Sequence, residues 1–212
     1  NYYRGWWIST ATVMCLGGGI WPLPNKREQG VIKFSTFFAR NGENKLTVNT
    51  HWNSPESQNY FEQPWYKDGL NAPKGFCAWA KAYQDDASPQ PRTNCAMAIY
   101  KGDEAYGVST IDVTLGFFNR LVKEMEKKVN GTILIVETDG KIVGSSALAE
   151  GKAELKNLSD FAANSPMAAE TQRLLPQLKE QKALESEFDV DGTSHTLFIR
   201  PIANSPWYLV TD

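Results

Sequence analysis

The chain has 212 residues, of which 42% are apolar and 22% charged, and its formal charge at neutral pH is −2. These proportions are typical of a soluble globular protein and argue against a disordered or fibrous chain. The small net charge provides no basic surface for nucleic acid and no polybasic patch for a membrane. The sequence contains no run of about 18 apolar residues, so it predicts no membrane-spanning helix. The length allows one large domain or two small ones.

The first half of the chain is predicted to be rich in strands. β-branched and aromatic residues favour strands early in the chain, and the glycines 17–19 between them predict a turn. This glycine run lacks the Gly-Lys-Ser/Thr continuation of a phosphate-binding loop, so the turn is the better interpretation. The predicted elements are a strand at 6–15, a short edge segment at 20–24, a strand or helix start at 31–39, a helical turn within 56–68, and antiparallel strands at 76–83, 94–100 and 105–112, with a proline-containing loop at 87–92.

In the second half of the chain, the spacing of the apolar residues changes. Apolar residues recur at steps of three and four over 113–129, which predicts an amphipathic helix, and Asn130-Gly131 ends it. Asp139-Gly140 and Asp191-Gly192 are strong signals for tight hairpin turns. The predicted elements are a hairpin at 132–137 and 141–146, helical segments at 154–163 and 166–183, a second hairpin at 185–190 and 194–201, and a last strand at 206–211.

This order predicts an α+β protein made of two units, each with an antiparallel sheet, joined by a helix. We place the boundary near Asp112, so that the units span residues 1–112 and 113–212.

The three cysteines are Cys15, Cys77 and Cys95, with no Cys-x-x-Cys motif. A disulfide between Cys77 and Cys95 is conceivable, because both lie on successive predicted strands. Simple pairing around the intervening loop would instead place Cys77 opposite residue 101. Buried free thiols are therefore the better prediction, and the cysteines do not reveal the compartment.

The sequence contains no pattern typical of an enzyme or a metal centre. Its two histidines, His51 and His195, fall in different predicted units. There is no His-Glu-x-x-His motif, no Cys/His cluster and no Gly-x-Ser-x-Gly elbow. We expect no catalysis, no metal and no cofactor.

Residues 60–112 carry the most distinctive pattern. Six of the seven tryptophans precede residue 80, which favours an aromatic pocket in the first half. On a strand at 76–83 and just beyond, Trp79, Tyr83 and Asp85 occupy odd positions and would share one face. Asp112 ends the next predicted strand. Two inward carboxylates without a basic partner would favour a bound cation.

Two plainer interpretations stand beside this one. The aromatic side chains, among them Tyr60, Trp65 and Tyr66, could be ordinary core residues. Asp112 could cap the helix at 113–129, a role worth about 1 kcal/mol.

At these positions the chain resembles the double-Cache family, which comprises tandem PAS-like extracytoplasmic sensor modules of bacterial transmembrane receptors. The resemblance is carried by Pro64-Trp65-Tyr66, the strand end Tyr83-Gln84-Asp85, the run from Tyr106 to Asp112 and the Asp139-Gly140 hairpin. It implies that residues 1–112 form a membrane-distal, ligand-binding unit and residues 113–212 a membrane-proximal unit. It also implies a longer, membrane-anchored protein with an N-terminal helix, absent from this sequence, that serves as the usual dimer contact.

The resemblance further implies a site for a small molecule. In amino-acid-binding members, aromatic residues line the pocket, acids hold the ligand ammonium, and an arginine holds its carboxylate; here the arginine position is occupied by Gln63. The resemblance carries these roles to Trp65, Tyr66, Tyr83, Asp85 and Asp112. We add Gln63 and the neighbouring aromatic residues Tyr60 and Trp79 to the expected ligand-binding residues.

A neutral glutamine is a weaker carboxylate partner than an arginine fork. We therefore expect a sensor for a small amine or quaternary ammonium compound, belonging to a chemoreceptor, histidine kinase or diguanylate cyclase. An amino-acid ligand is the alternative if Arg40 or Lys81 replaces the missing arginine. A carbohydrate-binding module or an enzyme is the alternative from another class.

Overall fold

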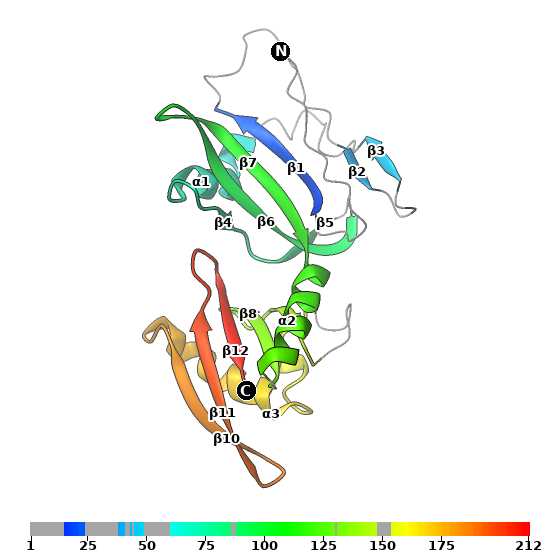
Figure 1. Ribbon diagram of the computed structural model, residues 1–212, viewed down its shortest axis with the longest axis vertical. Helices are drawn as coiled ribbons and strands as arrows, with labels where there is room; N and C mark the ends of the chain where they lie inside the picture. The colour runs from blue at the N-terminus through cyan, green and yellow to red at the C-terminus, as the bar shows by residue number, and fades with distance from the viewer. Residues whose placement is uncertain are drawn as a thin grey trace. The chain divides into compact units, whose positions relative to one another are not determined.

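The computed structural model describes residues 15–23, 38–40, 43, 45–48, 60–85, 88–129, 131–147 and 154–212 (Figure 1). The chain divides into two compact units. Unit 1 comprises the described residues up to Ala80 together with Gln84–Thr114. Unit 2 comprises Leu115–Asp212 together with the short segment Lys81–Tyr83.

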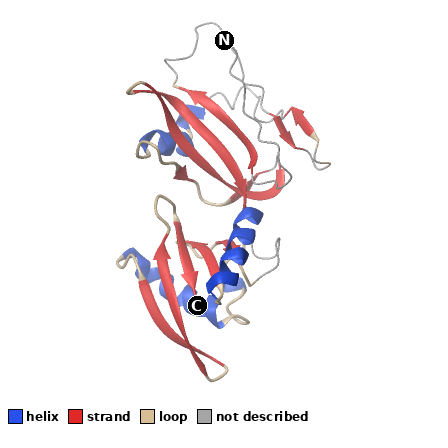
Figure 2. Cartoon of the chain, viewed as in Figure 1, coloured by secondary structure: helices blue, strands red, loops and turns tan. Residues whose placement is uncertain are grey.

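Unit 1 is built on a five-stranded antiparallel sheet with the order β1-β7-β6-β4, in which β5 also pairs with β6. Figure 2 draws the strands of both units in red and the helices in blue. The long β6–β7 hairpin is its centre and turns at Gly102, whose φ of +65° suits glycine. A separate pair, β2 and β3, stands outside this sheet. The strands are β1 (Cys15–Pro22), β2 (Phe38–Arg40), β3 (Leu46–Val48), β4 (Ala78–Trp79), β5 (Tyr83–Asp85), β6 (Ser88–Lys101) and β7 (Glu104–Thr114).

Helix α1 (Pro64–Asn71) covers one face of this sheet. Pro64 suits the first helical turn, which has no partner for its N–H group. A Cβ atom at Gly69 would lie 2.8 Å from Val108 Cγ1 and 2.9 Å from Ala96 Cβ, so only glycine allows the helix to approach this closely. Tyr60 and Tyr66 complete the buried cluster between helix and sheet.

Several expectations for unit 1 are wrong. Gly17–Gly19 lie within strand β1 and form no turn, because an edge strand can pair through its backbone without side chains. The expected strand at 76–83 is two short strands, β4 and β5, separated by Ala80–Ala82. The expected loop at 87–92 lies mostly within β6, which begins at Ser88. The expected strand at 6–15 falls outside the described residues except for Cys15.

Unit 2 contains a second five-stranded antiparallel sheet with the order β10-β11-β12-β8-β9. Both expected hairpins are confirmed, with Gly140 and Gly192 at positive φ in their turns. The strands are β8 (Ile133–Glu137), β9 (Ile142–Ser145), β10 (Leu184–Val190), β11 (Thr193–Pro201) and β12 (Trp207–Thr211).

The helices of unit 2 are shorter than their sequence patterns suggest. Helix α2 (Leu115–Val129) follows β7 directly, and α3 (Pro166–Leu174) starts with the Ser165 side chain as its cap. Pro176 cannot continue an α-helix, so the chain changes to the 3-10 helix η4 (Leu175–Lys179). The helix expected at 154–163 is wrong, since only the 3-10 turn η3 (Leu158–Asp160) forms there. The α+β class with two antiparallel sheets is confirmed.

The prediction of free thiols at Cys77 and Cys95 is wrong. The two residues form a disulfide, with their Cα atoms 5.5 Å apart. The register pairs Ala78 with Ala96 and Trp79 with Cys95, which brings Cys77 beside Cys95. A simple loop between two strands would give a different register, with Cys77 opposite residue 101. The register differs because the intervening chain also forms β5.

We expect loss of the disulfide to destabilise the protein. The bond closes a loop with a sequence separation of 18, and a loop of this size is worth about 3 kcal/mol. Urea denaturation of Cys77→Ser and Cys95→Ser should show this loss, and a reducing agent should reproduce it in the native protein. Cys15→Ser is the matched control, since it leaves the bond intact. Identical unfolding with and without reductant would contradict the prediction.

Candidate functional site

A polar cluster lies on the face of the unit 1 sheet that carries α1. Asn94 and Asp112 are direct cross-strand partners, and Asn94 Nδ2 donates to Asp112 Oδ1 over 2.8 Å. Arg92 NH1 lies 3.8 Å from Asp112 Oδ2, and the Arg92 and Asp112 side chains are 7% and 15% exposed. Two oppositely charged groups are therefore held together at a largely buried place.

The cluster lies beside a strand without side chains. Gly17 of β1 pairs with Asp112, and Gly19 pairs with Thr110. Residues paired directly across antiparallel strands share one sheet face, so β1 presents no Cβ atom next to Asp112 or Thr110. Glycine inside a strand often marks a place where a ligand or another backbone approaches closely.

The aromatic residues of α1 lie over the same sheet face. Trp65 and Tyr66 stack edge to face with ring centroids 5.7 Å apart, and Tyr60 lies 5.2 Å from Tyr66 in a similar arrangement. Tyr66 is almost fully buried and contributes to the core, whereas Trp65 is half-buried. Val108 beneath the helix and Asp112 are four residues apart on β7, about 13 Å along the strand.

The structure brings only some of the expected site residues together. Tyr60, Trp65 and Tyr66 form one cluster, on the sheet face that also carries Asp112. Trp79 pairs with Cys95 and therefore lies on the opposite face. Trp79 lies on β4, whereas Tyr83 and Asp85 lie on β5. Alternation along a single strand therefore does not place these three residues on one sheet face. Tyr83 begins β5, and the side chain of Asp85 lies outside the described residues.

The two cations considered as replacements for the missing arginine behave differently. Lys81 Nζ binds Asp139 Oδ2 over 2.8 Å in unit 2. The side chain of Arg40 lies outside the described residues. Gln63 is exposed and provides the backbone cap of α1, with its carbonyl accepting from the N–H groups of Tyr66 and Lys67.

Sequence reasoning missed Arg92 and Asn94. The prolines of residues 87–92 predict a loop, in which the alternation of side chains between two faces has no meaning, yet Arg92 lies inside β6 two residues before Asn94. The expectation that Asp112 has no basic partner is therefore wrong. The alternative of a helix cap is also wrong, because Asp112 lies within β7 and α2 begins at Leu115.

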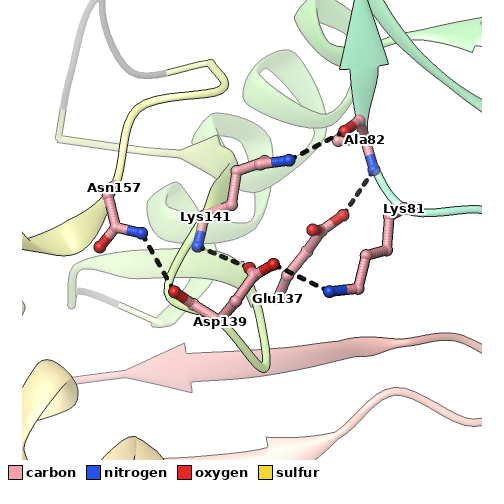
Figure 3. A network of polar contacts seen from close by, with 6 residues as sticks. All are labelled: Lys81, Ala82, Glu137, Asp139, Lys141 and Asn157. Atoms are coloured by element: carbon pink, nitrogen blue, oxygen red, sulfur yellow. Dashed lines mark hydrogen bonds and ion pairs between the residues drawn. The ribbon is translucent and has the colours of Figure 1, made fainter.

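A second polar network lies in unit 2, around the β8–β9 hairpin (Figure 3). Glu137 Oε1 accepts the Ala82 N–H over 2.5 Å, and Lys141 Nζ donates to the Ala82 carbonyl over 3.3 Å. Glu137 is fully buried. Lys81 pairs with Asp139, whose backbone carbonyl accepts from Asn157.

Burial competes with hydrogen bonds and charges in setting the pKa values of this network, and it prevails at Glu137. It raises the pKa of Glu137, against the opposing effects of the Ala82 N–H and of Lys141. Burial acts in the same direction on Asp139, but the hydrogen bonds from Lys81 and from the Lys141 N–H outweigh it and lower the pKa of Asp139. The hydrogen bond to Asp139 raises the pKa of Lys81. Because Lys81 and Asp139 are about half exposed, their pair adds little stability.

Within the described part of the chain, no group of three or more His, Cys, Asp or Glu side chains could hold a metal ion. Among those residues there is likewise no helix long and apolar enough to cross a bilayer.

Residues 10–120 match the family model of the methyl-accepting chemotaxis protein-like, first PDC sensor domain. The chain belongs to this family. The resemblance to Cache-type sensor modules is thereby confirmed, and the PDC domain is a ligand-binding sensor domain of receptors, not an enzyme.

Solved structures agree with this assignment. The extracellular domain of the histidine kinase mmHK1S-Z2 is 15% identical over 93% of this chain and 74% of its own, with a TM-score of 0.58. Methyl-accepting chemotaxis protein X is 12% identical over 94% of this chain and 74% of its own, also with a TM-score of 0.58. At these identities the likeness concerns the fold. No curated protein sequence matches this chain significantly.

We expect Gly69→Ala to destabilise the PDC domain. The added methyl group would clash with Val108 and Ala96, and overpacking of this kind costs about 1–3 kcal/mol. Urea denaturation measures the loss, and Asp68→Ala on the exposed side of the same helix is the control. Unchanged stability in Gly69→Ala would contradict the close approach of α1.

We expect Glu137 to make stability depend on pH. Its pKa is raised above its ordinary 4.5 in the folded state, so its contribution is fully present below pH 4.5 and is lost as pH rises through the raised value. Unfolding free energies of the native protein should therefore fall relative to Glu137→Gln as pH rises from 4.5 towards neutrality. Parallel pH profiles for the two proteins would contradict this.

Proposed function

We propose that unit 1 senses a small molecule with a protonated amino group and a carboxylate, such as an amino acid. The observation that carries this proposal is the Arg92–Asp112 pair on the glycine-lined face of the sheet. Asp112 would hold the ammonium, and Arg92 the carboxylate.

The fixed orientation of Asp112 supports its role. Asn94 Nδ2 donates to Asp112 Oδ1 over 2.8 Å from the directly opposite position on β6. This bond fixes the rotamer of Asp112, so the carboxylate is oriented before a ligand arrives.

The charge of the cluster supports a zwitterionic ligand. Arg92 and Asp112 sum to zero, and a ligand with one charge of each sign keeps this balance. A simple amine would add a net positive charge at a largely buried place, which is costly. The guanidinium fork also matches a carboxylate better than any neutral donor. Arg92 can thus supply the charge that Gln63 lacks.

A simple amine or quaternary ammonium compound is the second candidate. The half-buried Trp65 lies over the same sheet face as Asp112, and an aromatic ring attracts a cation by about 0.5–2 kcal/mol. The neutral Gln63 is consistent with this ligand class.

We also propose that residues 1–112 form the membrane-distal unit and residues 113–212 the proximal unit of a membrane-anchored receptor. The Cys77–Cys95 disulfide supports an extracytoplasmic location, since such bonds persist in oxidising compartments. Periplasmic exposure, membrane anchoring and dimerisation through an N-terminal helix can be tested by thiol labelling and cross-linking of the full-length receptor in cells.

A thermal-shift comparison of the twenty amino acids with their decarboxylated amines tests the ligand class. A ligand that binds the folded state raises the melting temperature by mass action. We expect Asp112→Asn to abolish the shift and Arg92→Gln to remove only the preference for amino acids. Loss of one charged hydrogen bond is worth about 1.5–3 kcal/mol, or about 10- to 150-fold in Kd.

Asp103→Asn is the control, because this carboxylate is fully exposed in the β6–β7 turn. Amino-acid binding that survives Arg92→Gln would show that another group holds the carboxylate. A shift with amines alone would favour the second candidate. Equal binding by the native protein and Asp112→Asn would overturn the site.

A further inference from the structure

The segment Lys81–Tyr83 belongs to unit 2, although the chain on both sides belongs to unit 1. It follows β4, and β4 and β5 both pair with β6. The chain therefore passes from unit 1 into unit 2 and back before it reaches the long β6–β7 hairpin.

Unit 2 holds both backbone polar groups of Ala82. The Ala82 N–H donates to Glu137, and the Ala82 carbonyl accepts from Lys141 (Figure 3). Ala82 is 2% exposed and Glu137 fully buried, so water cannot easily replace the Ala82–Glu137 hydrogen bond. A buried N–H without an acceptor carries the full cost of its desolvation.

Two residues earlier, the same segment is fixed to the polar cluster of unit 1. The Ala80 N–H donates to the Asn94 carbonyl over 2.8 Å, and Thr93 Oγ1 donates to the Ala80 carbonyl over 2.7 Å. The Asn94 side chain in turn binds Asp112. A continuous series of hydrogen bonds and peptide links thus runs from Asp112 through Asn94 and Ala80–Ala82 to Glu137.

We propose that Glu137 and Lys141 are positioning residues for the ligand site of unit 1. By holding Ala82 they fix Ala80 against Thr93 and Asn94, and so keep the Asn94 amide directed at Asp112. Because coupling between two sites is reciprocal, a ligand that binds Asp112 strengthens the hold on Ala82. This part of the inference rests on the proposed function.

Glu137 is fully buried, so the acceptor that it offers to the Ala82 N–H is shielded from water. Moreover, Glu137 Oε2 accepts no hydrogen bond from the described residues. The charges that act on Glu137 are those of Lys81, Asp139 and Lys141.

Amide hydrogen exchange by NMR tests the proposal in the native protein, Glu137→Ala and Glu137→Gln. Each is measured alone and with an equimolar mixture of the twenty amino acids. Glu137→Ala should speed exchange of the Ala82 amide by at least about tenfold, and exchange should also rise at Ala80 and Asn94. Glu137→Gln keeps an acceptor and should restore the native pattern.

With the amino-acid mixture, Glu137→Ala should weaken protection of the β6–β7 amides, as expected for a Kd raised by about fivefold or more. Lys141→Met, which removes only the donor to the Ala82 carbonyl, serves if Glu137→Ala does not fold. Faster exchange confined to Ala82, with Ala80 and Asn94 unchanged, would overturn the proposal.

The amino-acid mixture separates the two proposals. If it protects nothing in the native protein, the amino-acid function fails. Amide exchange in the samples without amino acids still shows whether Glu137 controls the protection of the Ala80 and Asn94 amides.

Discussion

The antiparallel pairing of β6 with β7 is the interaction on which unit 1 depends. It places Asn94 opposite Asp112 and Ala98 opposite Val108, and β6 also receives β4 and with it the disulfide. The small side chain of Ala96 and the absence of one at Gly69 let α1 lie close to this ladder. A slip by one residue would turn Asp112 to the other face.

Local signals predicted most of unit 2. An Asp-Gly turn and the period of an amphipathic helix are properties of neighbouring residues, so the two hairpins and α2 follow from the sequence. The fold of unit 1 is less predictable from the sequence, because its strands pair with strands that are distant in the sequence. Gly17–Gly19 became a strand only because β7 offers them backbone partners, and no local pattern predicts the interruption between β4 and β5.

The candidate site shows the same division. The family resemblance pointed to Asp112 and to the aromatic residues of α1, which share one sheet face. The sequence does not predict the role of Arg92, because Pro89 and Pro91 favour a loop where β6 has already begun. The charge partner of a carboxylate depends on strand register, and here the register changes the predicted ligand from a cation to a zwitterion.

The hold on Ala82 has a consequence for domain exchange between receptors. Glu137 and Lys141 recognise the N–H and the carbonyl of Ala82, which every residue except proline possesses. A hybrid joined between Thr114 and Leu115 would combine the Ala82 segment of one parent with the hairpin of the other. Such hybrids can keep both hydrogen bonds to residue 82 without matched sequences, provided that a small residue stands at this position.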